Sequence, residues 1–248
     1  MVKIRTNNIL VKNKQGKKGL GLALTYPCAE AIELIGMLGG FDFVNLDGEH
    51  GLFSPKAVDE MTRIADGYGL TTIARVANRE ASSVNLFLDR GIMGIQGPHV
   101  ETAAEAKALV DACRFAPDGQ RSWGGGRGTF YNESVLIDQP GLLRKEFMVN
   151  SNNEMLVMCQ LESAKAFENL EEILLVNGID AFAWGTNDLA LSMGYPGDPE
   201  NPTVQKAQNA IGERIHAAGK FLTSDIMEPM SLIETIVDRA KQFLLDNQ

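Results

Sequence analysis

The chain alternates short apolar runs with longer stretches in which apolar residues recur every three or four positions. The longer spacing is typical of a helix with one buried face, and a short continuous apolar run is typical of a strand covered on both sides. The pattern predicts strands at residues 19–25, 41–46, 71–76, 91–96, 155–161, 179–184 and 220–223. It predicts helices at residues 28–39, 54–67, 81–90, 101–114, 163–176, 201–218 and 229–246.

This alternation predicts an α/β fold with a parallel sheet and helices outside it. So many strand–helix units in about 250 residues favour a closed (β/α)8 barrel of the TIM type, formed by residues 1–248 as a single domain. No convincing eighth strand follows Thr223, so we expect an atypically short C-terminal end. Residues 115–153 are rich in glycine and asparagine, and a loop of that length in a compact domain is usually functional or mobile.

Composition and charge limit which partners and which cellular compartment we expect for the protein. The net charge of −9 argues against a nucleic-acid partner, which would favour a basic surface. The three cysteines are widely spaced and form no CxxC motif, as expected for ordinary thiols in a reducing compartment. The N-terminal region shows no signal-peptide pattern, and no apolar run is long enough to cross a membrane. We therefore expect a cytoplasmic protein without a membrane partner.

Polar residues gather where the predicted strands end. In a parallel barrel these ends meet at one mouth, which is where barrel enzymes have their active sites. The residues in question are Asp47, Glu49, His50, Arg75, Gln96, Pro98, His99, Gln160, Glu162, Thr186, Asn187 and Asp188. Their convergence from distant parts of the chain predicts an enzyme.

Two carboxylates in this set, Glu162 and Asp188, follow neighbouring strands. Carboxylate oxygens suit Mg²⁺ or Mn²⁺. Alternatively, both residues could simply cap the helices that follow them. His50 can exchange a proton near neutral pH, with Asp47 close enough to orient it, or it can be a histidine satisfied by Asp47 within a turn.

The arginines leave two interpretations open as well. Arg75 at a strand end needs an anion or a polarised oxygen to offset its desolvation, and an ion pair with Glu49 or Asp47 would also serve. Arg121 and Arg127 in the long loop could bind a distal carboxylate of a substrate, or could form an oligomer contact.

Five segments together resemble a known family. They are FDFVNLDGEH at 41–50, ARV at 74–76, GPHV at 97–100, QLE at 160–162 and GTNDLALSMGYPG at 185–197. In this order they resemble the HpcH/HpaI aldolase family, whose members are class II, metal-dependent pyruvate aldolases with a phosphoenolpyruvate/pyruvate-type barrel. That family includes 4-hydroxy-2-oxoheptanedioate and 2-dehydro-3-deoxyglucarate aldolases. The DGEH segment and residues 185–197 are the specific parts of the resemblance.

The resemblance implies cleavage or formation of a 4-hydroxy-2-oxo acid, with pyruvate and an aldehyde as the small-molecule partners. The cofactor would be Mg²⁺, Mn²⁺ or Co²⁺, which would stabilise the pyruvate enolate. By this resemblance, Glu162 and Asp188 are metal ligands, and His50 paired with Asp47 is the base. Arg75 would polarise the 2-oxo oxygen.

The resemblance also assigns substrate-binding positions. Gln160 would lie beside the metal, and the backbone around Asn187 and Asp188, in the segment that starts at Gly185 and Thr186, would hold the pyruvate carboxylate. Thr186 departs from the proline that the family usually has there. Because the family exchanges C-terminal helices between subunits, a homo-oligomer, hexameric or trimer-based, is implied.

Other activities remain open at this stage. A CoA-thioester lyase of the citrate lyase β-subunit type would use a related barrel, but those relatives are usually longer at the C-terminus. Decarboxylation of oxaloacetate would use the same enolate. A non-catalytic barrel would have lost a ligand or the base, yet Glu162, Asp188, His50 and Arg75 are all present.

Overall fold

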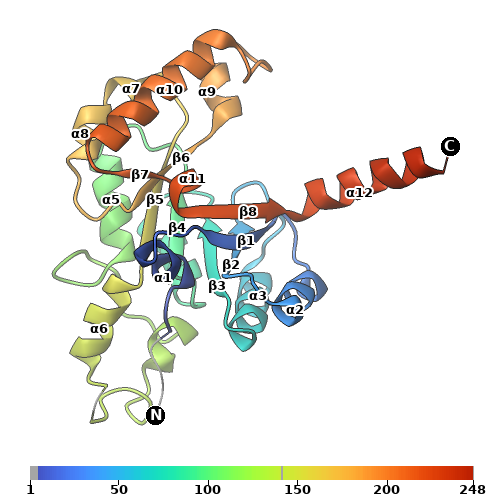
Figure 1. The fold of residues 1–248 in the computed structure, drawn as a ribbon. Coiled ribbons are helices and arrows are strands. Elements are labelled where there is room, and N and C mark those ends of the chain that lie inside the picture. The colour runs from blue at the N-terminus through green and yellow to red at the C-terminus, as the bar shows by residue number, and fades with distance from the viewer. Residues whose placement is uncertain (1–4, 141, 248) are drawn as a thin grey trace.

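The computed structural model describes residues 5–140 and 142–247, and its centre is a curled sheet of eight parallel strands (Figure 1). The strands are β1 (Gly19–Leu24), β2 (Phe43–Asp47), β3 (Thr71–Arg75), β4 (Gly94–Gly97), β5 (Leu156–Leu161), β6 (Ala181–Trp184), β7 (Phe221–Leu222) and β8 (Met227–Ser231). Their order in the sheet is β7-β6-β5-β4-β3-β2-β1-β8. This confirms the predicted (β/α)8 TIM-type architecture.

Most of the helices follow strands and cover the outside of the sheet, as the alternation predicted. The helices are α1 (Asn8–Lys14), α2 (Ala29–Leu38), α3 (Pro55–Gly67), α4 (Ala81–Leu88), α5 (Ala103–Cys113), α6 (Arg144–Asn153), α7 (Ala164–Glu168), α8 (Leu170–Leu174), α9 (Thr186–Ser192), α10 (Pro202–Ala217), α11 (Thr223–Ile226) and α12 (Leu232–Asp246). The Ser54 hydroxyl accepts a hydrogen bond from the Ala57 N–H, and Pro55 opens α3, so the predicted cap is formed.

The alternation of side chains along each strand separates two cores. Residues such as Val44 and Leu46 pack against the outer helices, whereas Phe43, Ile73 and Leu156 pack inside the barrel. Successive side chains of a strand point to opposite faces. The inner row that starts with these apolar residues therefore ends, toward the mouth, in polar ones.

An eighth strand is present, although the residues after Thr223 show no convincing strand pattern. β8 pairs in parallel with β1, and Pro229 stands opposite Gly21. The strand was missed because a proline among short polar and apolar residues does not have the pattern of a buried strand. Proline is tolerated here because β8 is an edge strand that needs donors on one side only. The last helix accordingly starts at Leu232, not at residue 229.

The barrel is not closed by hydrogen bonds between β7 and β8, which are the two edges of the sheet. The short helix α11 lies between them. Beyond β8, α12 projects away from the rest of the fold (Figure 1). None of its residues is buried, and its exposed apolar side chains include Ile236, Phe243 and Leu244. Apart from Leu232 in the first turn, which packs against the core, the described residues leave the apolar side of this amphipathic helix uncovered.

Three local features differ from the sequence prediction. The predicted helix at 163–176 is divided at Asn169 into α7 and α8. The long loop at 115–153 contains the 3₁₀ segment Arg127–Asn132 and helix α6. Near the N-terminus, α1 is an unpredicted helix, and its Ile9 is fully buried in the inner core.

Candidate active site

The strand register brings three of the predicted site residues side by side at the mouth. Asp47 at the end of β2 stands opposite Arg75 at the end of β3, and Arg75 stands opposite Gln96 in β4. All three belong to the inner row of side chains. The strand ends that the sequence identified therefore do converge.

Asp47 and Arg75 form a two-pronged ion pair. The Arg75 Nε and Nη2 atoms donate to the two carboxylate oxygens of Asp47 over 3.0 and 2.7 Å. Burial alone would raise the pKa of Asp47, but the hydrogen bonds from Arg75 and from the following turn outweigh it, so the pKa lies below its ordinary value. Arg75 therefore forms an ion pair, which was one of its two predicted roles. The two hydrogen bonds fix the plane of its guanidinium.

The turn after β2 places the next two site residues. Asp47 Oδ1 also accepts the backbone N–H groups of Glu49 and His50, over 3.1 and 3.2 Å. The chain folds back so tightly that a Cβ on Gly51 would lie 2.1 Å from the Asp47 carbonyl oxygen. Glycine at position 51 is therefore needed for this close approach.

The His50 side chain is not oriented by Asp47 as the sequence suggested. Asp47 binds the His50 backbone, while the imidazole is two-thirds exposed and its Nε2 lies 3.8 Å from Glu49 Oε2. The reason is that Arg75 occupies both oxygens of Asp47. The imidazole therefore stands at the open side of the mouth, where solvent and a small molecule can reach it.

Glu162 is the most deeply buried carboxylate of the site. Its side chain is almost completely buried, and its Oε1 accepts the His99 backbone N–H over 2.6 Å. Gln160 donates its side-chain amide to Oε2 and is in turn a hydrogen-bond partner of Gln96. On the other side, a Cβ on Gly185 would lie 2.0 Å from Glu162 Oε2, so only glycine fits there.

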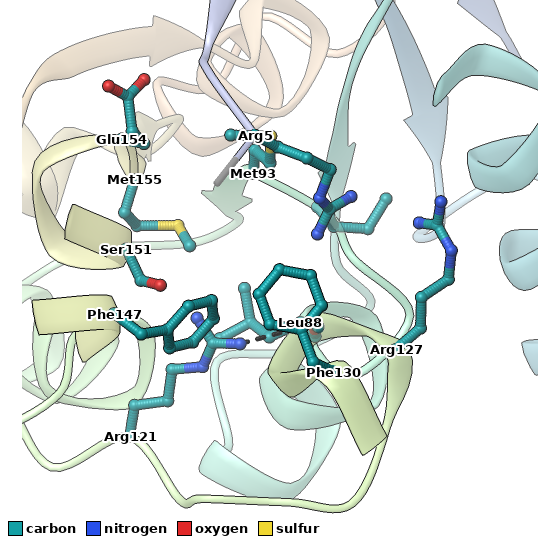
Figure 2. Close-up of a pocket in the computed structure, with 12 residues that line it drawn as sticks. Arg5, Leu88, Met93, Arg121, Arg127, Phe130, Phe147, Ser151, Glu154 and Met155 are labelled. Carbon is teal, nitrogen blue, oxygen red and sulfur yellow. Dashed lines mark hydrogen bonds between the residues drawn. The ribbon is translucent and has the colours of Figure 1, made fainter. Parts of the chain in front are cut away.

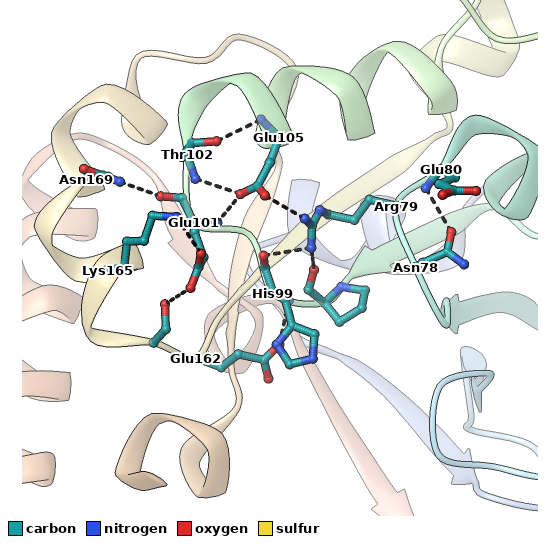
Figure 3. Close-up of polar contacts among 12 residues, drawn as sticks. Asn78, Arg79, Glu80, His99, Glu101, Thr102, Glu105, Glu162, Lys165 and Asn169 are labelled. Atoms are coloured by element: carbon teal, nitrogen blue, oxygen red, sulfur yellow. Dashed lines mark hydrogen bonds and ion pairs between the residues drawn. The ribbon is translucent and has the colours of Figure 1, made fainter. Parts of the chain in front are cut away.

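His99 is a residue whose place the sequence analysis underrated. Its Nδ1 lies 2.9 Å from Glu162 Oε1 (Figure 3), and its Nε2 lies 3.4 Å from Glu49 Oε1. Its backbone φ of 52° is unusual for a residue other than glycine. Arg79 holds this conformation by donating to the carbonyl oxygens of Pro98 and His99. In the sequence, the only indication of this role was that His99 directly follows Gly97 and Pro98 at the end of a predicted strand.

Glu49 is a second, largely buried carboxylate near Glu162. Burial raises its pKa; Arg75 lowers it through its charge, and the nearby negative charge of Glu162 raises it further. The nearest cation is Arg75, whose Nη1 is 3.2 Å from Glu49 Oε2. That Oε2 is nevertheless buried without a hydrogen bond. Asp47, Glu49 and Glu162 thus concentrate more negative charge at the mouth than Arg75 offsets.

Asp188 lies in the first turn of α9, three residues after Gly185, the residue that closely approaches Glu162. Within residues 5–140 and 142–247, no three His, Cys, Asp or Glu side chains form a group that could hold a metal ion. Two protein carboxylates, completed by water and substrate oxygens, are nevertheless a usual set for Mg²⁺. The assignment of Glu162 and Asp188 as ligands stays a prediction.

The loop arginines lie at the opposite end of the barrel. Arg127 pairs with Asp66 in the last turn of α3, and Arg121 donates to the carbonyl of Leu88 at the end of α4. Both helices run back from the mouth to where the next strand begins. Binding of a distal carboxylate at this chain's own mouth by Arg121 or Arg127 is therefore excluded.

Similarity to known proteins agrees with the site. The model of the HpcH/HpaI aldolase/citrate lyase family matches residues 29–244. A 4-hydroxy-2-oxovalerate aldolase of Rhodococcus jostii is 33% identical over 207 residues, which are 83% of this chain and 76% of the relative. A 2-keto-3-deoxy-L-rhamnonate aldolase of Klebsiella pneumoniae is 31% identical over 214 residues, 85% of this chain and 77% of the relative.

A solved structure adds the fold. An HpcH/HpaI aldolase/citrate lyase family protein from Burkholderia cenocepacia superposes with a TM-score of 0.81 at 25% identity, covering 98% of this chain and 99% of that one. No helix in the described part of the chain is long and apolar enough to cross a membrane. The convergent strand ends, the family match and the aldolase relatives lead to one conclusion: the chain belongs to the HpcH/HpaI aldolase/citrate lyase family and is a carbon–carbon lyase.

Proposed function

We propose that the protein is a divalent-metal-dependent aldolase that cleaves or forms a 4-hydroxy-2-oxo acid, with pyruvate and an aldehyde as the other side of the reaction. The observation that carries this proposal is the pair of neighbouring carboxylates at the mouth, the buried Glu162 and the largely buried Glu49, which lies beside Arg75. The names of the relatives, which are aldolases for 2-oxo acids, support the same class of substrate.

The charges of the mouth fit a divalent cation. Glu162 is 3% exposed and receives its hydrogen bonds from an amide and from His99, and no lysine or arginine pairs with it among the described residues. A buried carboxylate in this condition is costly unless a cation offsets it. Glu162 and Asp188 would hold the cation. When bound, it would stabilise the negative charge that develops on the 2-oxo oxygen as the carbon–carbon bond breaks.

The protein's own residues would position substrate and move the proton. Asp47 holds the Arg75 guanidinium in one plane, so its Nη1 side can donate to a substrate oxygen without reorganisation. His50, exposed at the open side, would remove the proton from the 4-hydroxyl in cleavage and pass it to C3 of the pyruvate enolate, and it would move the proton the opposite way in synthesis. Gln160 would keep Glu162 fixed throughout.

The segment after β6 would bind the pyruvate carboxylate. Gly185 is the cap of α9, and the N–H groups of Thr186, Asn187 and Asp188 are first-turn donors without acceptors inside the helix. A carboxylate next to Glu162 would accept them. Thr186 leaves one more N–H available at this point than a proline would.

We propose also that the protein is a homo-oligomer in which α12 packs against a second copy. The apolar side of α12 is uncovered, with Ile236 52% and Phe243 57% exposed. The family resemblance implies exchange of the C-terminal helix. Light scattering on the full chain and on a variant that ends at Ser231 tests this: the full chain should be larger than one 27.0 kDa copy, and the shortened chain should lose the association.

Pyruvate release from 4-hydroxy-2-oxo acids, measured through lactate dehydrogenase, tests the proposed reaction. We expect pyruvate release from several 4-hydroxy-2-oxo acids that differ in the aldehyde they yield. Oxaloacetate and a CoA thioester are the comparison substrates. Turnover of either of these, without any release of pyruvate from the hydroxy-oxo acids, would contradict the proposal and favour a decarboxylase or a CoA-thioester lyase.

A further inference from the structure

At the end of the barrel away from the mouth, three arginines surround a small cavity (Figure 2). Arg5 comes from the chain before α1, and Arg121 and Arg127 come from the loop after α5. Apolar side chains complete the wall, among them Phe130 and Phe147. The cavity has a volume of about 40 Å³.

The arginines share too few carboxylates. Arg5 and Arg127 both bind the single carboxylate of Asp66. The two guanidinium groups also approach each other, because a Cβ built on Gly91 would lie 2.6 Å from Nη1 of Arg5 and 2.7 Å from Nη1 of Arg127. The Nη1 atom of Arg127 is buried without a hydrogen-bond acceptor.

Arg121 is less compensated still. It is 8% exposed, and its guanidinium lies 4.5 Å from the centre of the Phe115 ring. One long contact of 3.4 Å joins its Nη2 to the Leu88 carbonyl oxygen, and its Nε is buried without a partner. Among the residues that the structure describes, no carboxylate forms an ion pair with it. Burial lowers its pKa to about 10, and the charge of Arg5 acts in the same direction.

Glu154 is the acidic residue of the cavity wall, and it does not neutralise this cluster. Its Oε2 accepts the Asn7 backbone N–H over 2.6 Å, and Figure 2 shows its carboxylate directed away from the three arginines. A buried cation that lacks a partner is strongly unfavourable. The described residues therefore do not supply an anion that would neutralise this cluster.

We propose that this cavity is a binding site for a small tetrahedral oxyanion of the phosphate type, separate from the active site. Guanidinium groups bind such oxygens through paired hydrogen bonds. The volume of about 40 Å³ is a few times the ~10–15 Å³ needed for one water, which suits a small ion and not a nucleotide. The apolar wall of Phe130 and Phe147 limits competition from water.

The site borders a strand that reaches the mouth. Met93 lines the cavity directly before β4 begins, and Gln96 near the other end of β4 bonds to Gln160. The bound anion would thus stabilise the start of β4 and the long loop that carries Arg121 and Arg127. Ligand binding to the folded state alone raises the unfolding temperature.

The experiment measures inorganic phosphate binding to the full chain, treated with EDTA, by calorimetry and by thermal unfolding at ionic strength matched with chloride. We expect phosphate to raise the unfolding temperature and chloride not to do so. Arg127→Gln and Arg5→Gln should each weaken phosphate binding roughly tenfold, the effect of losing one charged hydrogen bond. Arg214→Gln is the matched control, because Arg214 is an exposed arginine paired with Glu171, and it should bind phosphate as the parent does.

A further variant separates this cavity from the mouth. If Arg75→Gln abolishes phosphate binding while Arg127→Gln leaves it unchanged, the anion binds at the mouth and the proposal is wrong. The proposal is equally wrong if phosphate gives no shift beyond that of chloride. Glycerol 3-phosphate distinguishes the source: weaker binding than phosphate assigns the site to the free ion, and tighter binding assigns it to a phosphoryl group on an organic molecule. Both of these results support an oxyanion site.

Discussion

The two ends of the barrel bury opposite charges. At the mouth, Glu162 is buried and Glu49 is largely buried, with Arg75 as the nearest arginine to Glu49. At the other end, Arg5, Arg121 and Arg127 surround a cavity, and Arg5 and Arg127 share the carboxylate of Asp66. The same strands run from one end to the other, so the fold itself sets neither charge. The difference agrees with the proposals of a cation at the mouth and an oxyanion at the other end.

The largest effect is expected from Glu162→Gln, which keeps the size of the side chain and removes its charge. Loss of a ligand that helps to stabilise developing charge costs several kcal/mol, so kcat should fall by about 10³-fold. Glu101→Gln is the matched control, because Glu101 sits outside the mouth and pairs with Lys165. Steady-state kinetics that found equal activity in both variants would remove Glu162 from the mechanism.

Arg75→Lys should have the next largest effect. A lysine cannot reproduce the two-pronged contact with Asp47 or present a second planar donor, so kcat should fall by roughly 10²-fold with a smaller change in KM. Arg63→Lys, at an exposed arginine that pairs with Asp59, should leave the kinetics unchanged. An Arg75→Lys enzyme with parental kcat would show that the guanidinium only supports the fold.

Gly185→Ala tests how closely β6 approaches Glu162. The new methyl group would overlap with Glu162 Oε2, and such overpacking costs about 1–3 kcal/mol. We expect a lower unfolding temperature and weaker metal binding. Gly125→Ala, where a Cβ meets open space, is the control. Unchanged metal binding in Gly185→Ala would mean that Glu162 can move freely.

The smallest effect concerns acid stability. The pKa of Asp47 is lowered in the folded protein, so its ion pair contributes stability above the ordinary value of 3.8 and loses it as the pH falls below that value. The contribution is about 1 kcal/mol or less, because solvent reaches part of the pair. The difference in unfolding free energy between the parent and Asp47→Asn should therefore shrink below pH 4. A difference that grows in acid would contradict this sign.

The fold and the strand-end residues of the mouth were largely predictable from the sequence, because the period of apolar residues and the position of a strand's last residue are local properties. β8 was not predictable, since Pro229 and Glu228 give no strand pattern and only pairing with β1 defines it. The ion pair of Asp47 depends on the neighbouring strand that carries Arg75, and the contacts of His99 depend on its left-handed backbone conformation. Neither can be seen in the local sequence. The arginine cavity unites residues more than a hundred positions apart, which no local pattern reveals.

Metal dependence is the central claim, and one measurement addresses it directly. The protein is stripped with EDTA, Mn²⁺ binding is followed by calorimetry and by electron paramagnetic resonance, and pyruvate release from a 4-hydroxy-2-oxo acid is recorded before and after Mg²⁺, Mn²⁺ or Co²⁺ is restored. The account predicts one Mn²⁺ bound per chain, loss of this binding in Glu162→Gln, and pyruvate release only with metal. Full activity of the stripped protein, or Mn²⁺ binding that Glu162→Gln leaves intact, would contradict it.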